Sequence, residues 1–194
     1  MGRYPGKATC DVSGLLLDEL RPVLALNLTA AEAADLDADG LLNDSATHTA
    51  NAKTYTTMLA QPPQARKLSF TPSAAADAGN ILVVGTDIDD NPITDKVATS
   101  ATNAVYSAKA FKTVTSVTYP KDDGGITWDA GWTEAIGLPL KLAAGPFALE
   151  KFNGVVEIGT AGTFAVDATD LAKNIYDPNG NLDGEKALQL LLFI

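Results

Sequence analysis

The sequence predicts a mainly β fold: an antiparallel β-sandwich or barrel-like domain with an extended N-terminal arm and a short helical segment. From residue 64 onward, β-branched and aromatic residues recur in short runs, and turn residues separate these runs at short intervals. The chain has 194 residues and is 46% hydrophobic, which is enough for one sizeable core. We therefore expect an arm with a small helical or irregular region over residues 1–63, and the β domain over residues 64–194.

The first 63 residues show little strand pattern. Residues 1–14 contain Pro5 and three glycines, which indicates an extended arm. A helix opening at "SGLLLDEL" would be broken by Pro22. Thr29 and Glu32 have the spacing of a capping box, and Gly40 is a typical helix end, so the short helix is expected to begin at Thr29.

Four stretches of the body predict strands. "RKLSFT" (66–71) alternates Leu68 and Phe70 with polar residues, and "NILVVGT" (80–86) is a short apolar run. "AVYSAKAFKTVTSVTYP" (104–120) is rich in β-branched and aromatic residues. "EKALQLLLFI" (185–194) indicates a last strand.

The charge of the chain is acidic and unevenly spread. The net charge is −10, while the first ten residues carry only Arg3 and Lys7. An acidic body is poorly suited to nucleic acid, because phosphate contacts need Lys and Arg. No apolar run approaches the roughly 20 residues of a membrane helix. We therefore expect neither nucleic acid nor a membrane as partner.

The sequence contains few residues suited to catalysis or to metal binding. The chain has one cysteine, Cys10, and one histidine, His48, so zinc sites and Cys–His nucleophilic pairs lack raw material. The default role of Cys10 is burial or anchoring of the arm. No Walker A, G-x-G-x-x-G or nucleophile-elbow motif is present. We accordingly predict no catalytic residues, no cofactor and no metal ligands.

Two aspartate-rich segments raise the question of calcium. Asp35, Asp37, Asp39 and Gly40 match the opening of an EF-hand loop, but its twelfth position is Ala46 instead of a bidentate acid. A looser site that shares Asn43 or Asp44 stays open for loop 35–44. In loop 177–183, Asp177, Asn179, Asn181 and Asp183 alternate as oxygen ligands do. An acidic helix end followed by a turn is favoured for the first segment, and ordinary turn chemistry for the second.

A third acidic cluster lies in "ILVVGTDIDDNPITDKV" (81–97). Asp87, Asp89 and Asp90 follow an apolar run, and Pro92 and Ile93 lead back into a second one. Aspartates favour turns because their side chains bond nearby backbone amides. The segment predicts a β-hairpin with a polar tip, with a metal site as the alternative.

Two tryptophans, Trp128 and Trp132, are the largest aromatic side chains of the chain. Stacking on a sugar is one role for such residues. Burial in a core or an interface is favoured, because large aromatic side chains dominate both.

Four phrases of the sequence, in order, resemble those of small virion structural proteins of tailed bacteriophages. They are "VVGTDIDDNPITDKV", "SAKAFKTVTSVTYP", "IGLPLKL" and "VDATDLAKNIYDPNGNLDGEKAL", and they cover roughly residues 68–190. The series usually has Gly where this chain has Asp90. Gly would supply the positive φ of a tight turn, so the turn is expected to be longer or to use Asn91.

The resemblance implies a non-enzymatic capsid decoration (cement) protein. Such a protein binds the outer surface of the major capsid protein lattice, commonly as a homotrimer, and stabilises the head. It is made in the host cytoplasm and ends on the capsid surface of the virion. For this chain we expect the arm, with Arg3, Tyr4 and Lys7, and the "LLLDEL" segment to contact neighbouring chains.

The alternative is a carbohydrate- or receptor-binding module of a phage tail or fibre. In that case Trp128 and Trp132, with the acidic turns, would form the ligand face. A hydrolase that uses acidic residues is the least favoured reading, because nothing in the sequence singles out a pair of carboxylates.

Overall fold

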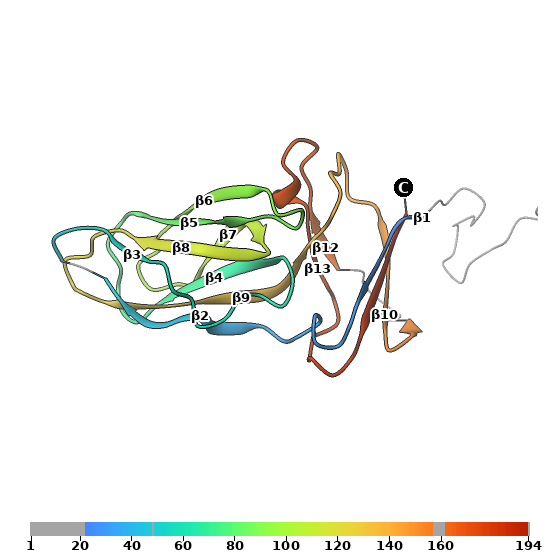
Figure 1. Ribbon diagram of the computed structural model, residues 1–194, viewed down its shortest axis with the longest axis horizontal. Coiled ribbons are helices and arrows are strands. Elements are labelled where there is room, and N and C mark those ends of the chain that lie inside the picture. Colours follow the sequence, from blue (N-terminus) through green and yellow to red (C-terminus); the bar gives the residue numbers. More distant parts are fainter. Residues whose placement is uncertain (1–21, 48, 157–161, 194) are drawn as a thin grey trace, which may run out of the picture.

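A computed structural model confirms the mainly β fold and describes residues 22–47, 49–156 and 162–193. The expected arm, with Arg3, Tyr4, Lys7, Cys10 and the "LLLDEL" segment, lies outside these residues, as does His48. Three antiparallel sheets form two lobes, which Figure 1 shows side by side along the long axis. The larger lobe is a sandwich, and the smaller lobe is a single curved sheet at the end where β1 (Pro22–Leu28) and the C-terminus lie.

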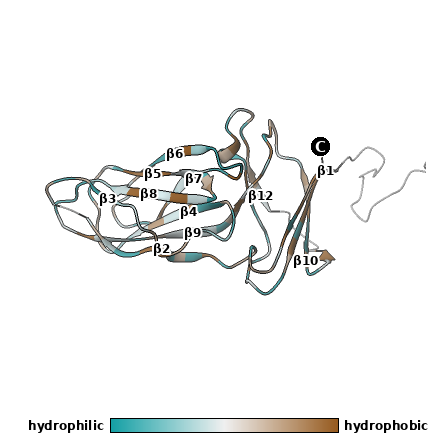
Figure 2. Cartoon of the chain, in the orientation of Figure 1, coloured by the Kyte–Doolittle hydropathy of each residue, from teal (hydrophilic) through white to brown (hydrophobic). Residues whose placement is uncertain are grey.

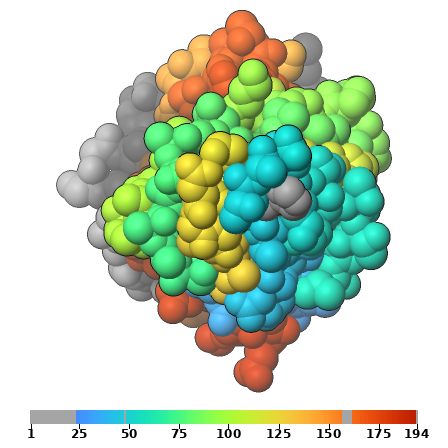
Figure 3. Space-filling model, turned by 90° about the vertical axis from the view of Figure 1, so that its left-hand side faces the viewer, coloured from blue at the N-terminus to red at the C-terminus, as the bar shows by residue number. Residues whose placement is uncertain are grey.

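Two sheets form the sandwich lobe. One has the order β3-β8-β5-β6 and the other the order β12-β13-β9-β4-β7, with β2 also paired to β9. Figure 3 views the far end of this lobe, where β3 lies beside β8. The bounds are β2 (Asp37–Ala46), β3 (Lys53–Tyr55), β4 (Arg66–Pro72), β5 (Asn80–Thr86), β6 (Pro92–Ala98), β7 (Val105–Phe111), β8 (Thr113–Tyr119), β9 (Thr127–Gly137), β12 (Thr163–Ala165) and β13 (Ile175–Asp177).

The sandwich core lies between these sheets. Side chains alternate along β5, where Ile81 and Val83 are fully buried, as a strand with one face on a core requires. Trp128 stacks on Tyr119 with the ring centroids 5.8 Å apart. Figure 2 shows hydrophobic segments on β2, β6 and β8. The alternation of inward and outward side chains, which is the main strand signal in the sequence, therefore places the apolar side chains in this core.

The smaller lobe is a four-stranded sheet of order β1-β14-β10-β11. Its inner face packs Leu188, Leu190 and Leu192 into a second core. Ile136 of β9 belongs to this second core, whereas Trp128 of the same strand belongs to the first, so β9 joins the two lobes. The bounds are β1 (Pro22–Leu28), β10 (Phe147–Phe152), β11 (Val155–Val156) and β14 (Leu188–Phe193), and a short 3-10 helix, η1 (Leu171–Lys173), precedes β13.

The prediction of a helix that begins at Thr29 is wrong. The capping box itself forms: the Thr29 amide donates to Glu32 Oε2 at 2.9 Å, and the Glu32 amide donates to Thr29 Oγ1 at 3.3 Å. However, the chain makes one turn only and then enters β2, which buries Leu41 and Leu42 against β9. The packing of β2 on β9 outweighs the local helix signal.

The first 63 residues contain more strand than the sequence indicates. β1 pairs with β14, β2 with β9, and β3 with β8, so each joins a sheet made largely of later strands. The approach of β2 is close at Gly131, where an added Cβ would lie 1.7 Å from the Asp37 carbonyl oxygen. The expected boundary at residue 63 therefore does not coincide with a break in the sheets.

Candidate functional site

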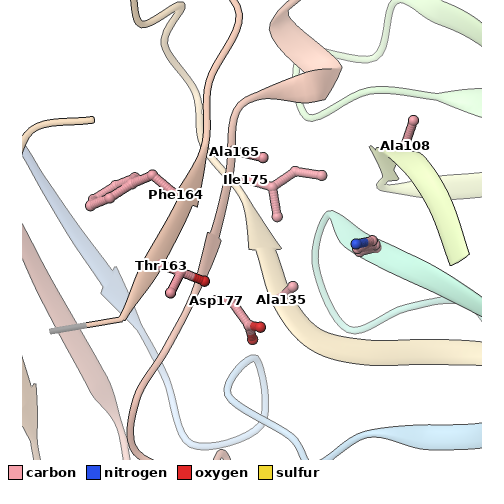
Figure 4. A pocket seen from close by; sticks show the side chains of 8 residues that line it. Ala108, Ala135, Thr163, Phe164, Ala165, Ile175 and Asp177 are labelled. Atoms are coloured by element: carbon pink, nitrogen blue, oxygen red, sulfur yellow. The ribbon is translucent and has the colours of Figure 1, made fainter. Parts of the chain in front are cut away.

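A groove crosses one face of the six-stranded sheet and has a volume of about 350 Å3. Its walls come from five strands that are far apart in the sequence but adjacent in the sheet. Figure 4 shows Thr163 and Phe164 on one strand, with Ile175 and Asp177 on the next. The lining consists of Lys67, Ala108, Ala135, Thr163, Phe164, Ala165, Ile175 and Asp177.

The groove combines a small-residue floor with charges of both signs. Three of the lining residues are alanines, so the hollow exists because short side chains leave space above the sheet. Lys67 Nζ lies 5.6 Å from the centre of the Tyr106 ring, and the Phe164 ring packs at 4.6 Å from the Tyr176 ring. A cation, an anion and an apolar floor suit the non-covalent docking of an extended polypeptide segment.

A set of carboxylates lies beside the groove. Partial burial raises the pKa of the Glu134 carboxyl, and the negative charges of Asp35 and Asp177 raise it further. The fold therefore brings one aspartate from each of the two aspartate-rich segments near the same glutamate. Across the described ranges 22–47, 49–156 and 162–193, no group of three or more His, Cys, Asp or Glu side chains is arranged to hold a metal ion.

Arg66 is fully buried beneath this acidic edge. Its Nη2 donates to the carbonyl oxygens of Glu32 and Ala34 at 2.8 and 3.0 Å. Its Nη1 donates to those of Thr133 and Glu134 at 3.3 and 3.1 Å. Burial lowers the pKa of the guanidinium to about 10, against the opposing effect of Glu134 and Asp35. Arg66 thus ties the turn after β1 to the middle of β9.

The EF-hand-like segment 35–46 is largely the strand β2. Since a strand rises about 3.3 Å per residue, the carboxylates of Asp37, Asp39 and Asp44 are spread along it rather than wrapped around one point. Asp37 and Asp39 instead accept hydrogen bonds from the Asp39 amide and the Asn43 side chain. The Asp44 amide donates to Asp129 Oδ1 at 2.8 Å. These contacts belong to a β-edge.

Loop 177–183 has turn contacts, and its amides surround a different carboxylate. Asp183 accepts from the Glu185 and Lys186 amides, and its pairing with Lys186 lowers its pKa to about 2. The amides of Asn179 and Gly180 donate to the carboxylate of Glu150 at 3.1 and 3.5 Å. The Glu150 carboxylate therefore holds this loop through the backbone amides of the loop.

Glu150 is a buried acid that the sequence does not single out. Besides those two amides, its carboxylate accepts hydrogen bonds from the Tyr176 hydroxyl and the Gly162 amide. Burial, with the Glu150 hydrogen bond, raises the pKa of the Tyr176 hydroxyl. In "FALEKF" an isolated acid beside a lysine resembles a surface position. Only the register of β10 against β14, which pairs Glu150 with Leu190, places it inside.

The hairpin predicted over residues 81–97 is confirmed, with Thr86 opposite Pro92 at its tip. Asp87 Oδ1 accepts from the amides of Asp89 and Asn91, both at 2.9 Å. Asp90 itself adopts the positive φ, 64°, that we expected Asn91 or a longer turn to supply. Its carboxylate pairs with Lys112 Nζ at 2.8 Å. The carboxylates of Asp87 and Asp90 therefore build and anchor this turn.

Trp128 and Trp132 are 1% and 6% exposed and lie in the sandwich core, as favoured from the sequence. The Trp132 indole N–H donates to the Asp35 carbonyl at 3.4 Å. Neither ring is open to a sugar. The alternative of a carbohydrate-binding module therefore loses the aromatic face on which it relied.

No protein-family model, curated protein or solved structure matches the chain. In the described part of the chain, no helix is both long and apolar enough to span a membrane.

Proposed function

We propose that the chain is a non-enzymatic capsid decoration protein of a tailed bacteriophage. It binds the outer surface of the major capsid protein lattice as a homotrimer and stabilises the head. The observation that carries the proposal is the ordered series of four phrases, which the fold uses as consecutive parts of one β body. They form the β5–β6 hairpin, the successive strands β7 and β8 of the two facing sheets, the connection from β9 to β10, and the path from η1 to β14.

The shape of the chain supports a docking role. The groove over the alanine floor offers one site for an extended segment of the capsid protein, with Lys67 and Asp177 to pair with its charges. A net charge of −10 favours a partner surface that is locally basic. A protein that binds only the assembled shell shifts the assembly equilibrium toward it by mass action. Several modest contacts around one symmetry axis would add avidity.

The proposal is tested on virions. Purified particles of the phage that encodes this chain are examined by mass spectrometry and by electron microscopy with an antibody against the chain. We expect the chain in the particle and the label on the head surface. Absence from the particles, or label confined to the tail, overturns the proposal.

The groove is tested separately by a binding assay on undecorated heads. Ala108→Arg fills the groove from an exposed position on β7 and should weaken binding. The matched control is Ala101→Arg, an exposed alanine between β6 and β7 that does not line the groove. Equal binding by the two variants would place the contact elsewhere on the surface without contradicting the capsid role.

A further inference from the structure

The outer face of the four-stranded sheet is largely apolar although it faces away from both cores. Residues that pair across antiparallel strands share a face, and Leu188, Leu190 and Leu192 point inward. One outer row is therefore Phe147 and Phe193, whose rings lie 6.0 Å apart. The next outer row is Ala25, Leu191 and Leu149, and the last is Asn27, Gln189 and Lys151 with the exposed Val156.

The apolar rows lie at the end of the sheet where the N-terminal segment joins it. Pro22, the first residue of β1, pairs with Phe193. The residues just before it read "SGLLLDELR" and carry four leucines, Leu15, Leu16, Leu17 and Leu20. The most apolar part of the N-terminal segment is thus joined directly to the most apolar part of the sheet face.

The length of the segment matches the face. Leu20 is two residues from Pro22 and so within about 7 Å of it, and Leu15 is within about 24 Å. Crossing from β1 over β14 to β10 requires about 10 Å, which is two strand spacings. Residues 15–20 can therefore cover both apolar rows of the sheet to which they are attached.

We propose that residues 15–20 pack on the outer face of the β1-β14-β10 sheet of their own chain, against Phe147, Leu149, Leu191 and Phe193. Attachment within the same chain favours this over capture by a second copy, because a short tether gives an effective concentration in the millimolar range. The docked segment removes from water an apolar surface that would otherwise promote association. This inference replaces the expectation that the "LLLDEL" segment contacts neighbouring chains, and it does not depend on the capsid role.

The test is cysteine cross-linking in the full chain. Cys10→Ser removes the native thiol, and Leu17→Cys with Leu191→Cys places one thiol on the segment and one on the face. A short bis-maleimide is added, and the products are separated by mass. The matched control replaces Leu191→Cys by Leu59→Cys, a 71% exposed position on the sandwich lobe. We expect the first pair to cross-link within one chain about tenfold or more faster than the control.

Two outcomes overturn the inference. Cross-links between two chains would show that the segment occupies a second copy, and a rate no higher than that of the control would show that the segment does not occupy the face. A second pair, Leu16→Cys with Leu149→Cys, repeats the test on another strand in case the first variant does not fold. Circular dichroism of each variant confirms that the β fold is intact before cross-linking is scored.

Discussion

Replacing Arg66 by methionine should destabilise the chain more than any change of a surface charge. Arg66 is fully buried, and its guanidinium donates to the carbonyl oxygens of Glu32, Ala34, Thr133 and Glu134. Methionine fills much of the space but donates to none of them. An acceptor left buried without a donor costs about 1–3 kcal/mol, and breaking a buried charged network typically costs about 3–5 kcal/mol in total.

We expect a loss of about 4 kcal/mol in the free energy of unfolding, which is within the range for a buried charged network. The loss is not larger because removing Arg66 also removes the desolvation cost of its guanidinium, which its lowered pKa reflects. A loss of about 4 kcal/mol corresponds to a fall in Tm of about 8–16 °C for a domain of this size. Urea unfolding, followed by tryptophan fluorescence, measures the loss in unfolding free energy, because Trp128 and Trp132 are buried in the folded chain. Lys67→Met, at the next residue of β4, is the matched control and should cost less than about 1 kcal/mol. If Arg66→Met unfolds within about 1 kcal/mol of the wild type, the carbonyl network does not hold the two lobes together.

Three further substitutions test other parts of the structure. Asp90→Gly should be more stable than Asp90→Ala by about 1 kcal/mol, because both lose the Lys112 pair but only Gly tolerates the φ of 64° without strain; equal urea midpoints would contradict this. Glu150→Ala should destabilise by about 3–5 kcal/mol because it leaves the Tyr176 hydroxyl and three amides without their acceptor, while Glu150→Gln keeps an acceptor and should cost less; equal losses would contradict the role of the carboxylate. Glu134→Gln should stabilise the fold near pH 7, because the raised folded-state pKa of Glu134 means that its ionised form is disfavoured in the fold. The gain should vanish as the pH falls below the unfolded-state pKa of 4.5, where Glu134 is protonated in both states, and a gain that persists there would contradict this cause.

Local patterns in the sequence predict the elements that depend on local structure. The hairpin around Asp87 and the last strand are correct because turn chemistry and apolar runs act over a few residues. The turn at Thr29 shows the limit of this reasoning. The capping box at Thr29 forms as predicted, yet the element that follows is the ten-residue strand β2. The conformation of β2 is set by its pairing with β9, which lies about 90 residues later in the chain.

The candidate site was less predictable because it depends on strand register. Charged side chains such as those of Arg66 and Glu150 are rarely fully buried, and the pairing of their strands with distant strands places both inside. The proximity of Asp35 and Asp177 to Glu134 has the same origin. The groove likewise takes its lining from five strands, and no single stretch of sequence contains it.

Two of the buried charges, Arg66 and Glu150, lie where the lobes meet the loops that connect them. Arg66 belongs to β4 of the sandwich, and two of its acceptors lie in the turn whose Ala33 packs into the core of the smaller lobe. Glu150 belongs to the smaller lobe and holds the loop that follows β13 of the six-stranded sheet. A buried charge adds less stability than a well-packed apolar group, but its hydrogen bonds are satisfied in one arrangement only. A protein that docks on a regular lattice with both lobes would benefit from such a fixed arrangement, since a loose hinge between the lobes would have to be ordered at each binding event.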